Sequence, residues 1–311
     1  MANGLNIIYM GTPGFAVPTL EALHASPHRV AQVVTQPDRP RGRGRKPTPP
    51  PVKAAALQMG LPVVQPETVR DPEFLQAVRN LSPDLLVVVA FGQILKPALL
   101  EIPQKGAINI HASLLPRYRG PAPIQWAIIQ GETETGVTTM FMDAGMDTGD
   151  ILLTRSEPIS AEDTAGALHD RLSVVGADLL LETLAGFERI RPIPQDDAQS
   201  SYAPLLKKQD GHIQWNQSAR AIDCRVRGVT PWPGAYTFIE GRRIKLFRTE
   251  PLGEPASAPP GTVVPGFPDE LRVATGHGVL SLRELQGESG RRLPVADFLR
   301  GRAVPPGVML T

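Results

Sequence analysis

The feature that most constrains this fold is a regular alternation of apolar and amphipathic segments over the first 190 residues. Segments 5–10 (LNIIYM) and 85–90 (LLVVVA) are almost wholly apolar, as expected of strands buried on both faces. Segments with helical spacing follow such runs, and the longest of them covers 164–190. This alternation predicts an α/β domain with a doubly wound, mostly parallel, Rossmann-like sheet that carries helices on both faces.

The remaining elements of this domain follow from the same periodicities. Further strands are expected at 30–35, 61–64, 107–111, 136–142 and 151–159, and helices at 17–24, 52–59, 73–81 and 121–129.

A change of pattern divides the chain after residue 190. Residues 191–208 contain prolines, aspartates and a serine pair, and we interpret them as a linker. Short strands separated by turn signals follow, which predicts a smaller C-terminal β-barrel of OB-like type. We therefore expect a catalytic or binding domain at 1–190 and a second domain at 209–311.

The composition excludes several classes of protein. The net charge is +1, so a nucleic-acid partner would have to be held by a local basic patch. Cys224 is the only cysteine, which excludes a disulfide framework and a multi-cysteine zinc site. The first apolar run is too short for a signal peptide or a membrane span. We expect a cytoplasmic protein that acts without a membrane partner, as a monomer.

The turn after the first strand resembles a dinucleotide-binding turn only in part. Gly11 and Gly14 lack the G-x-G-x-x-G spacing, and Pro13 removes a backbone N–H where a pyrophosphate would need one. We therefore do not expect a nicotinamide site.

Residues 37–51 (PDRPRGRGRKPTPPP) form a strongly basic segment. Its prolines and glycines predict that it lies in neither a strand nor a helix. It could be a solvated loop, but its cations face a single acid, Asp38, and this imbalance favours binding of an external polyanion. The candidate binding residues are Arg39, Arg41, Arg43, Arg45 and Lys46.

A polar pair lies in the expected strand 107–111. Asn109 and His111 share one face of it, while Ile108 and Ile110 point the other way. A loop rich in proline, glycine and arginine follows, and then a helix begins. Open α/β sheets bind ligands at such places, although a structural hydrogen-bonded pair is the simpler reading of an isolated Asn-x-His.

Three aspartates follow in the segment DAGMDTGD, namely Asp143, Asp147 and Asp150. Turns favour aspartate for backbone reasons, and no second histidine or ligand cluster accompanies them, so no metal site is expected. Together with Asn109 and His111, one of these acids could support acyl chemistry. The amide and the imidazole would stabilise an oxyanion, and a carboxylate would move a proton from an attacking amine. No activated nucleophile accompanies His111, which favours direct transfer.

Two segments, INIHASLLPRYRGPAPIQWAI and DAGMDTGDIL, resemble the folate-dependent formyltransferase family. The resemblance extends to MGTPGFAVPTLEAL, to the basic segment and to KKQDGHIQWNQSARAIDCRVRGVTPWPGAYT, as in the branch that acts on methionyl-tRNA. It implies that Asn109, His111 and Asp147 are catalytic. It also implies that Ser113, Leu114, Leu115 and Pro116 bind the folate.

The resemblance implies a reaction as well. The formyl group of 10-formyltetrahydrofolate would pass to the α-amine of initiator methionyl-tRNA, and the basic segment and the β-domain would hold the tRNA. Two alternatives stay open: a folate-dependent formyltransferase acting on a small-molecule or sugar-nucleotide amine, and a non-enzymatic RNA-binding protein on the same scaffold.

Overall fold

The computed structural model describes residues 4–41 and 46–311, and these form two compact units. Unit 1 comprises residues up to 120 together with 135–157 and 169–203, and unit 2 comprises 121–134, 158–168 and 204–311. None of the helices in the described ranges has both the length and the hydrophobicity needed to cross a membrane.

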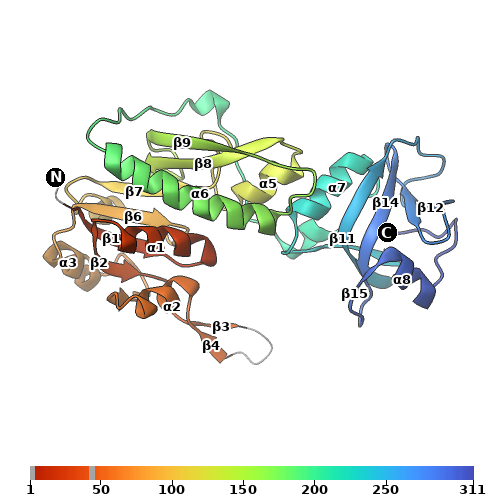
Figure 1. Cartoon of the computed structure of the whole chain (residues 1–311), viewed down its shortest axis with the longest axis horizontal. Coiled ribbons are helices and arrows are strands. Elements are labelled where there is room, and N and C mark those ends of the chain that lie inside the picture. Colours follow the sequence, from red (N-terminus) through yellow and green to blue (C-terminus); the bar gives the residue numbers. More distant parts are fainter. Residues whose placement is uncertain (1–3, 42–45) are drawn as a thin grey trace. The chain divides into compact units, whose positions relative to one another are not determined.

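Unit 1 is built around one sheet, which confirms the predicted α/β class (Figure 1). Within the described ranges its strand order is β5-β2-β1-β6-β7-β8-β9. The pairs from β5 to β7 are parallel, and β8 joins β7 antiparallel. The strands are β1 (Asn6–Gly11), β2 (Arg29–Val34), β5 (Val63–Val64), β6 (Leu85–Val89), β7 (Ala107–His111), β8 (Glu134–Phe141) and β9 (Ile151–Pro158).

The helices of the first 190 residues lie close to the predicted ranges. They are α1 (Val17–Ala25), α2 (Pro51–Gln58), α3 (Pro72–Asn80), α4 (Pro97–Leu100) and α6 (Ala165–Gly186), together with α5 (Pro123–Ile129), which belongs to unit 2. The start of α3 shows why: the Asp71 carboxylate accepts a hydrogen bond from the Glu73 N–H at 3.0 Å, and Pro72 occupies the first helical position. Only α4, a single turn, was not predicted.

Helix α6 covers one face of β7. A Cβ on Gly176 would lie 3.0 Å from Ile110 Cγ2, so the helix approaches the strand closely at this glycine. Beside it, the hydroxyls of Thr139 on β8 and Thr183 on α6 are 2.8 Å apart. Ile108 and Ile110 are therefore buried beneath α6, as the alternation along the strand predicts.

The opposite face of the sheet carries a second hydrophobic cluster, which α3 and α4 help to cover. Its buried members include Ile8, Met10, Leu86, Val88, Val78, Leu99 and Ala107. Ala107 pairs with Leu86, and Asn109 pairs with Val88, so the polar pair Asn109 and His111 continues this face along β7. The strand thus brings an amide and an imidazole to the border of a hydrophobic core.

The basic segment departs from the prediction. We expected no strand there, but β3 (Arg39–Arg41) and β4 (Lys46–Thr48) form a two-stranded antiparallel ribbon. Pro40 faces Pro47 in this ribbon. Because neither has an N–H, they can oppose each other at a position without ladder hydrogen bonds, so prolines are tolerated in a ribbon whose two strands are both edges. The prediction was wrong for these short strands; residues 42–45, with Arg43 and Arg45, lie outside the described part of the chain.

Unit 2 contains an antiparallel sheet, which confirms the predicted C-terminal β-sheet domain (Figure 1). Its strand order is β10-β11-β14-β13-β12, with β15 beside β14. The strands are β10 (Ala235–Ile239), β11 (Arg242–Leu252), β12 (Val263–Val264), β13 (Leu271–Ala274), β14 (Val279–Gln286) and β15 (Arg292–Pro294).

Three helices pack in unit 2. The predicted one is α5 (Pro123–Ile129), whereas α7 (Ala219–Gly228) and α8 (Val295–Gly301) were not predicted. The signal for α7 is present in the sequence: Ser218 caps it by accepting from Ala221 N–H, and Ala219, Ile222 and Val226 are buried at helical spacing.

Candidate active site

The structure brings together two of the three residues to which the sequence assigns chemistry. Asp147, from the loop between β8 and β9, places its Oδ2 3.6 Å from Nδ1 of His111 at the end of β7. The His111 side chain is 7% exposed and that of Asp147 is 18% exposed, so the pair is shielded but can be reached from solvent. A carboxylate and an imidazole in this arrangement can exchange a proton through a small shift or a single water.

The other ring nitrogen of His111 has a fixed partner. Its Nε2 lies 2.9 Å from the carbonyl oxygen of Tyr118, and a carbonyl can only accept, so this nitrogen carries a hydrogen. A neutral ring in this tautomer presents an Nδ1 lone pair to Asp147. A ring protonated on both nitrogens is attracted to the Asp147 carboxylate, and because 3.6 Å is too long for a hydrogen bond between them, its Nδ1–H can donate to a third atom.

Asp147 is held in an uncommon backbone conformation, with φ of 56°. Its Oδ2 accepts a hydrogen bond from the Gly120 N–H at 2.8 Å, which orients the carboxylate. Asp143 is occupied differently, because its carboxylate accepts from the Gly145 N–H and from the Thr148 hydroxyl within its own turn. Left-handed backbone is uncommon at residues other than glycine, although aspartate adopts it more readily than most, and such residues cluster at functional sites.

Asn109 is the third predicted residue. It is partly buried on the same face of β7 as His111, next to Met140 on β8. Within the ranges that the structure describes, its amide makes no hydrogen bond. The amide is therefore available to donate to an oxygen beside His111.

The stretch predicted to bind folate, from Ser113 to Pro116, makes hydrogen bonds that stabilise its own loop. Ser113 is fully buried, its hydroxyl donates to the Arg117 carbonyl at 2.6 Å, and its own carbonyl accepts from the Thr138 hydroxyl at 2.7 Å. The Leu115–Pro116 peptide bond is cis. These contacts shape the loop after β7, and the folate-binding role of the stretch stays a prediction.

A hollow of about 280 Å³ opens beside Asp147. Its walls are mainly apolar, with Leu95, Met140, Met142 and the exposed side chains of Ile94 and Met146, and its polar groups include Gln93, Lys96 and Asp143. Ligand pockets combine apolar walls with a few polar groups in this way. These residues could not be predicted from the sequence, because the hollow forms only where the loop after β6 meets the loop after β8.

Of the basic residues in the ribbon, Arg39 is the one whose side chain the structure describes. Arg39 is exposed and makes no ion pair with any residue in the described ranges. Its acidic neighbour Asp38 is engaged elsewhere: Lys53 donates to both of its carboxylate oxygens at 2.8 Å, and these hydrogen bonds, with one from Gln65, lower the pKa of Asp38. The one acid of the segment therefore does not neutralise the arginine beside it.

Three of the basic residues of unit 2 have different surroundings. Arg227 is structural, because it donates to the Asp223 carboxylate at 2.9 Å and to the Asp163 carbonyl at 3.1 Å. Arg225 lines a polar hollow and lies 5.7 Å from the centre of the Trp126 ring, and burial lowers its pKa. Arg243 stacks on Tyr236 at 4.0 Å.

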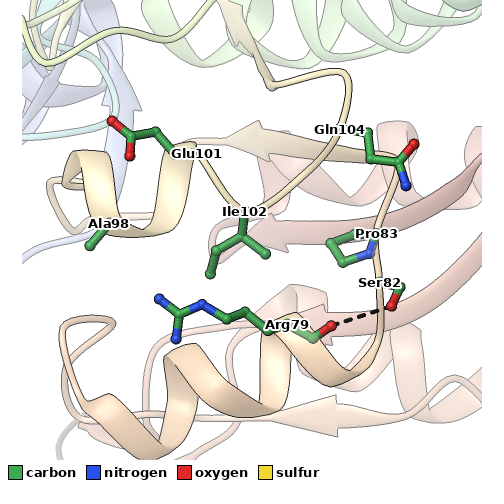
Figure 2. A pocket seen from close by; sticks show the side chains of 7 residues that line it. All are labelled: Arg79, Ser82, Pro83, Ala98, Glu101, Ile102 and Gln104. Atoms are coloured by element: carbon green, nitrogen blue, oxygen red, sulfur yellow. Dashed lines mark hydrogen bonds between the residues drawn. The ribbon is translucent and has the colours of Figure 1, made fainter.

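A separate hollow of about 430 Å³ lies where β6 and β7 begin. Figure 2 shows Arg79 and Glu101 extending beside it from α3 and the end of α4. It contains none of the predicted catalytic residues. No group of three or more metal-ligating side chains occurs in the part of the chain that the structure describes.

Comparison with known families decides the class of protein. The model of the formyl transferase domain matches residues 5–184, and that of the formyl transferase C-terminal domain matches residues 205–303. The chain belongs to the formyl transferase family. Its N-terminal and C-terminal segments correspond to the two domains of formyl transferases.

Curated members of the family are similar over almost the whole chain. The methionyl-tRNA formyltransferase of Citrifermentans bemidjiense is 54% identical over 99% of this chain and 96% of its own. That of Geobacter sulfurreducens is 52% identical over 99% of this chain and 97% of its own. A solved N-formyltransferase from Helicobacter canadensis shares the fold at 19% identity, with a TM-score of 0.68 over 93% of this formyl transferase and 100% of that chain.

Proposed function

We propose that this formyl transferase moves the formyl group of 10-formyltetrahydrofolate to the free α-amino group of initiator methionyl-tRNA, giving N-formylmethionyl-tRNA for translation initiation. The observation that carries the proposal is the 54% identity with a curated methionyl-tRNA formyltransferase over 99% of the chain. The proximity of His111 to Asp147 supports it as well, because an imidazole and a carboxylate at this distance can stabilise an oxyanion and accept a proton.

The neutral amine attacks the formyl carbon, and a new C–N bond forms as the carbonyl oxygen becomes an oxyanion. With His111 protonated on both ring nitrogens, its Nδ1–H and the Asn109 amide donate to that oxygen, and such donors act most strongly as charge develops. Asp147 accepts the proton that the amine loses, directly or through a water. The bond from carbon to N10 then breaks, and N10 takes up the proton that Asp147 had accepted, directly or through a water, which leaves tetrahydrofolate and the formylated amine and restores the carboxylate.

We propose that the hollow beside Asp147 holds the ring system of the folate. Its apolar walls suit a flat heteroaromatic ring, and it adjoins the carboxylate of Asp147, the proposed proton acceptor. Ile94→Asp is expected to raise the KM for 10-formyltetrahydrofolate about tenfold, which corresponds to about 1.4 kcal/mol, while the melting temperature stays nearly constant because Ile94 is 59% exposed.

Leu57→Asp is a matched control, because Leu57 is also 59% exposed and lies on α2, outside the hollow. Steady-state kinetics with the folate as the varied substrate checks both variants. An unchanged KM in Ile94→Asp would place the folate ring elsewhere, and the stretch from Ser113 to Pro116 would then be the next site to test.

We further propose that the predicted basic residues bind the tRNA. Replacing Arg39, Arg41, Arg43, Arg45 and Lys46 by serine is expected to weaken tRNA binding and to make the slope of log K against log salt shallower, by about 0.7 to 0.9 for each lost phosphate contact. The melting temperature should stay almost the same, because the sequence offers these five cations a single acid, Asp38, and charges without close partners contribute little to stability. Affinity for the folate should not change.

Serine replacements of the exposed Arg70 and Arg189 provide a control for the general effect of charge. Binding titrations at several salt concentrations measure both slopes. If the slope of the ribbon variant equals that of the unmodified protein, the ribbon does not contact tRNA phosphates.

The substrate class is tested by offering competing amines. With 10-formyltetrahydrofolate as donor, the proposal predicts rapid formylation of methionyl-tRNA and negligible formylation of amino-sugar nucleotides or of free methionine. Preferential formylation of an amino-sugar nucleotide would replace the proposed acceptor while leaving the chemistry of the site in place.

A further inference from the structure

Residues 191–203, whose composition predicts a linker, belong to unit 1 and contact both the loop after β7 and the loop between β8 and β9. We name them the strap. At one end, the backbones of Ile193 and Ile151 exchange two hydrogen bonds of 2.8 and 2.9 Å. At the other end, the backbone N–H of Arg119 donates to the carbonyl of Ser201 at 2.8 Å, and the carbonyl of Arg119 accepts from the Ala203 N–H at 2.7 Å. The strap is therefore a fixed part of the site's surroundings.

Gln195 joins the two loops through both ends of its amide. Its Nε2 donates to the carbonyl of Asp147 at 2.9 Å and to the carbonyl of Gly149 at 2.7 Å. Its Oε1 accepts from Nε and Nη2 of Arg119 at 3.0 and 2.8 Å. One partly buried side chain thus makes these four hydrogen bonds to the segments that carry Asp147 and Gly120, and its Nε2 also contacts the Met140 sulfur at 3.8 Å.

The contact with Asp147 bears on its strained backbone. Asp147 adopts a φ of 56°, a left-handed conformation that residues other than glycine adopt rarely and keep only where their surroundings impose it. The hydrogen bonds from Gln195 to the carbonyls of residues 147 and 149 fix the direction of this turn. They therefore also fix the direction in which the carboxylate leaves the backbone.

Ser201 has the corresponding contact on the histidine side. Its hydroxyl accepts a hydrogen bond from the Tyr118 N–H at 2.8 Å, and Tyr118 has a φ of 61°. The carbonyl of Tyr118 in turn accepts the hydrogen bond that sets the ring of His111. Both members of the His111–Asp147 pair are thus held through residues with left-handed backbone, and each of these residues is tied to the strap.

We propose that Gln195 and Ser201 are positioning residues for formyl transfer, and that the strap sets the orientation of His111 and Asp147 relative to each other. The inference rests on the proposed function, because it assigns a purpose to the contacts around the proposed catalytic pair. Neither residue touches the reacting atoms, so their effect passes through His111 and Asp147. Misplacement of a reacting group by about 1 Å can cost about a hundredfold in rate.

The first test compares two replacements of Gln195. Gln195→Leu removes all four hydrogen bonds, whereas Gln195→Glu keeps acceptors for Arg119 and loses both donations to the carbonyls. Both variants are expected to lower kcat by about 10- to 100-fold, with the KM for the folate and for methionyl-tRNA changed by less than about threefold. Ser201→Ala should lower kcat in the same way, but less. Normal kcat in Gln195→Glu would overturn the role assigned to the two carbonyl contacts.

The second test asks whether Gln195 acts through Asp147. In Asp147→Asn the carboxylate is gone, so adding Gln195→Leu should lower kcat by less than about twofold further, although it lowers kcat at least tenfold in the unmodified protein. Groups that act as one unit show this lack of additivity. If the two effects multiply, Gln195 has only a general structural role, and the inference fails.

The control comes from the strap itself. Gln199 is exposed, and its amide donates to Asp196 at 2.8 Å without contacting either loop of the site. Gln199→Leu should leave kcat and both KM values unchanged. Melting temperatures of all variants show whether each is folded at the assay temperature.

The outcomes also separate this inference from the proposed function. Full activity in Asp147→Asn would refute the proposed catalytic pair itself. An inactive Asp147→Asn together with a fully active Gln195→Leu would keep the proposed function and refute the strap's part in it.

Discussion

Replacing His111 by alanine is expected to lower kcat for formyl transfer by a hundredfold or more. The side chain would donate to the oxyanion from Nδ1 while Nε2 is fixed by the Tyr118 carbonyl, and the loss of one oxyanion donor typically costs about 10²–10³ in rate. Asn109→Ala should have an effect of the same size, because its amide is the second proposed donor. Single-turnover measurement of formylation gives both values.

Binding of tRNA is the control for these two variants, since neither side chain belongs to the proposed tRNA surface. Its dissociation constant should change by less than about twofold. Near-normal turnover in a folded Asn109→Ala or His111→Ala protein would remove that residue from the catalytic set.

The Asp147→Asn variant is expected to keep its fold and to lose most of its activity, about a hundredfold or more. Asparagine tolerates a positive φ, and its carbonyl oxygen can still accept from the Gly120 N–H, so the loop should keep its shape. It cannot accept the proton of the attacking amine, however. Steady-state kinetics at saturating substrates measures the loss.

The neighbouring acids provide the comparison for Asp147. Asp143→Asn retains an acceptor for the Gly145 N–H and should lose less than about tenfold, and Asp150→Asn should also lose less than Asp147→Asn. An inactive Asp143→Asn beside an active Asp147→Asn would show that the carboxylate has been assigned to the wrong residue.

The central strand shows which part of the site is readable from sequence. A strand has a period of two residues, so the spacing of Asn109 and His111 was enough to place both on one face and the isoleucines on the other. The structure has this arrangement, with Ile108 and Ile110 buried against α6. The same local rules predicted most of the other elements of unit 1.

Contacts between distant loops were not readable in this way. The sequence offered three aspartates near the histidine, and the resemblance to a family, not the spacing, singled out Asp147. The structure adds the physical distinction, since Asp143 is used by its own turn and Asp147 approaches His111. The contacts of Gln195 link segments about 50 residues or more apart in sequence, and no local pattern reveals them.

The basic ribbon and helix α7 show two further limits. Prolines and glycines argued against strands at 39–48, but a ribbon with two free edges can accommodate them by placing Pro40 opposite Pro47. Helix α7 was not predicted, although its signal is local: the sequence has a capping serine and helical spacing of the residues that are buried.

The most direct test of the account is the initial rate of formyl transfer from 10-formyltetrahydrofolate to charged methionyl-tRNA, measured beside uncharged tRNA and beside the Asp147→Asn variant. The account predicts rapid formylation of the charged tRNA by the unmodified protein, none of the uncharged tRNA, and a rate at least about a hundredfold lower with the variant. No transfer to charged methionyl-tRNA, or an equal rate in Asp147→Asn, would contradict it.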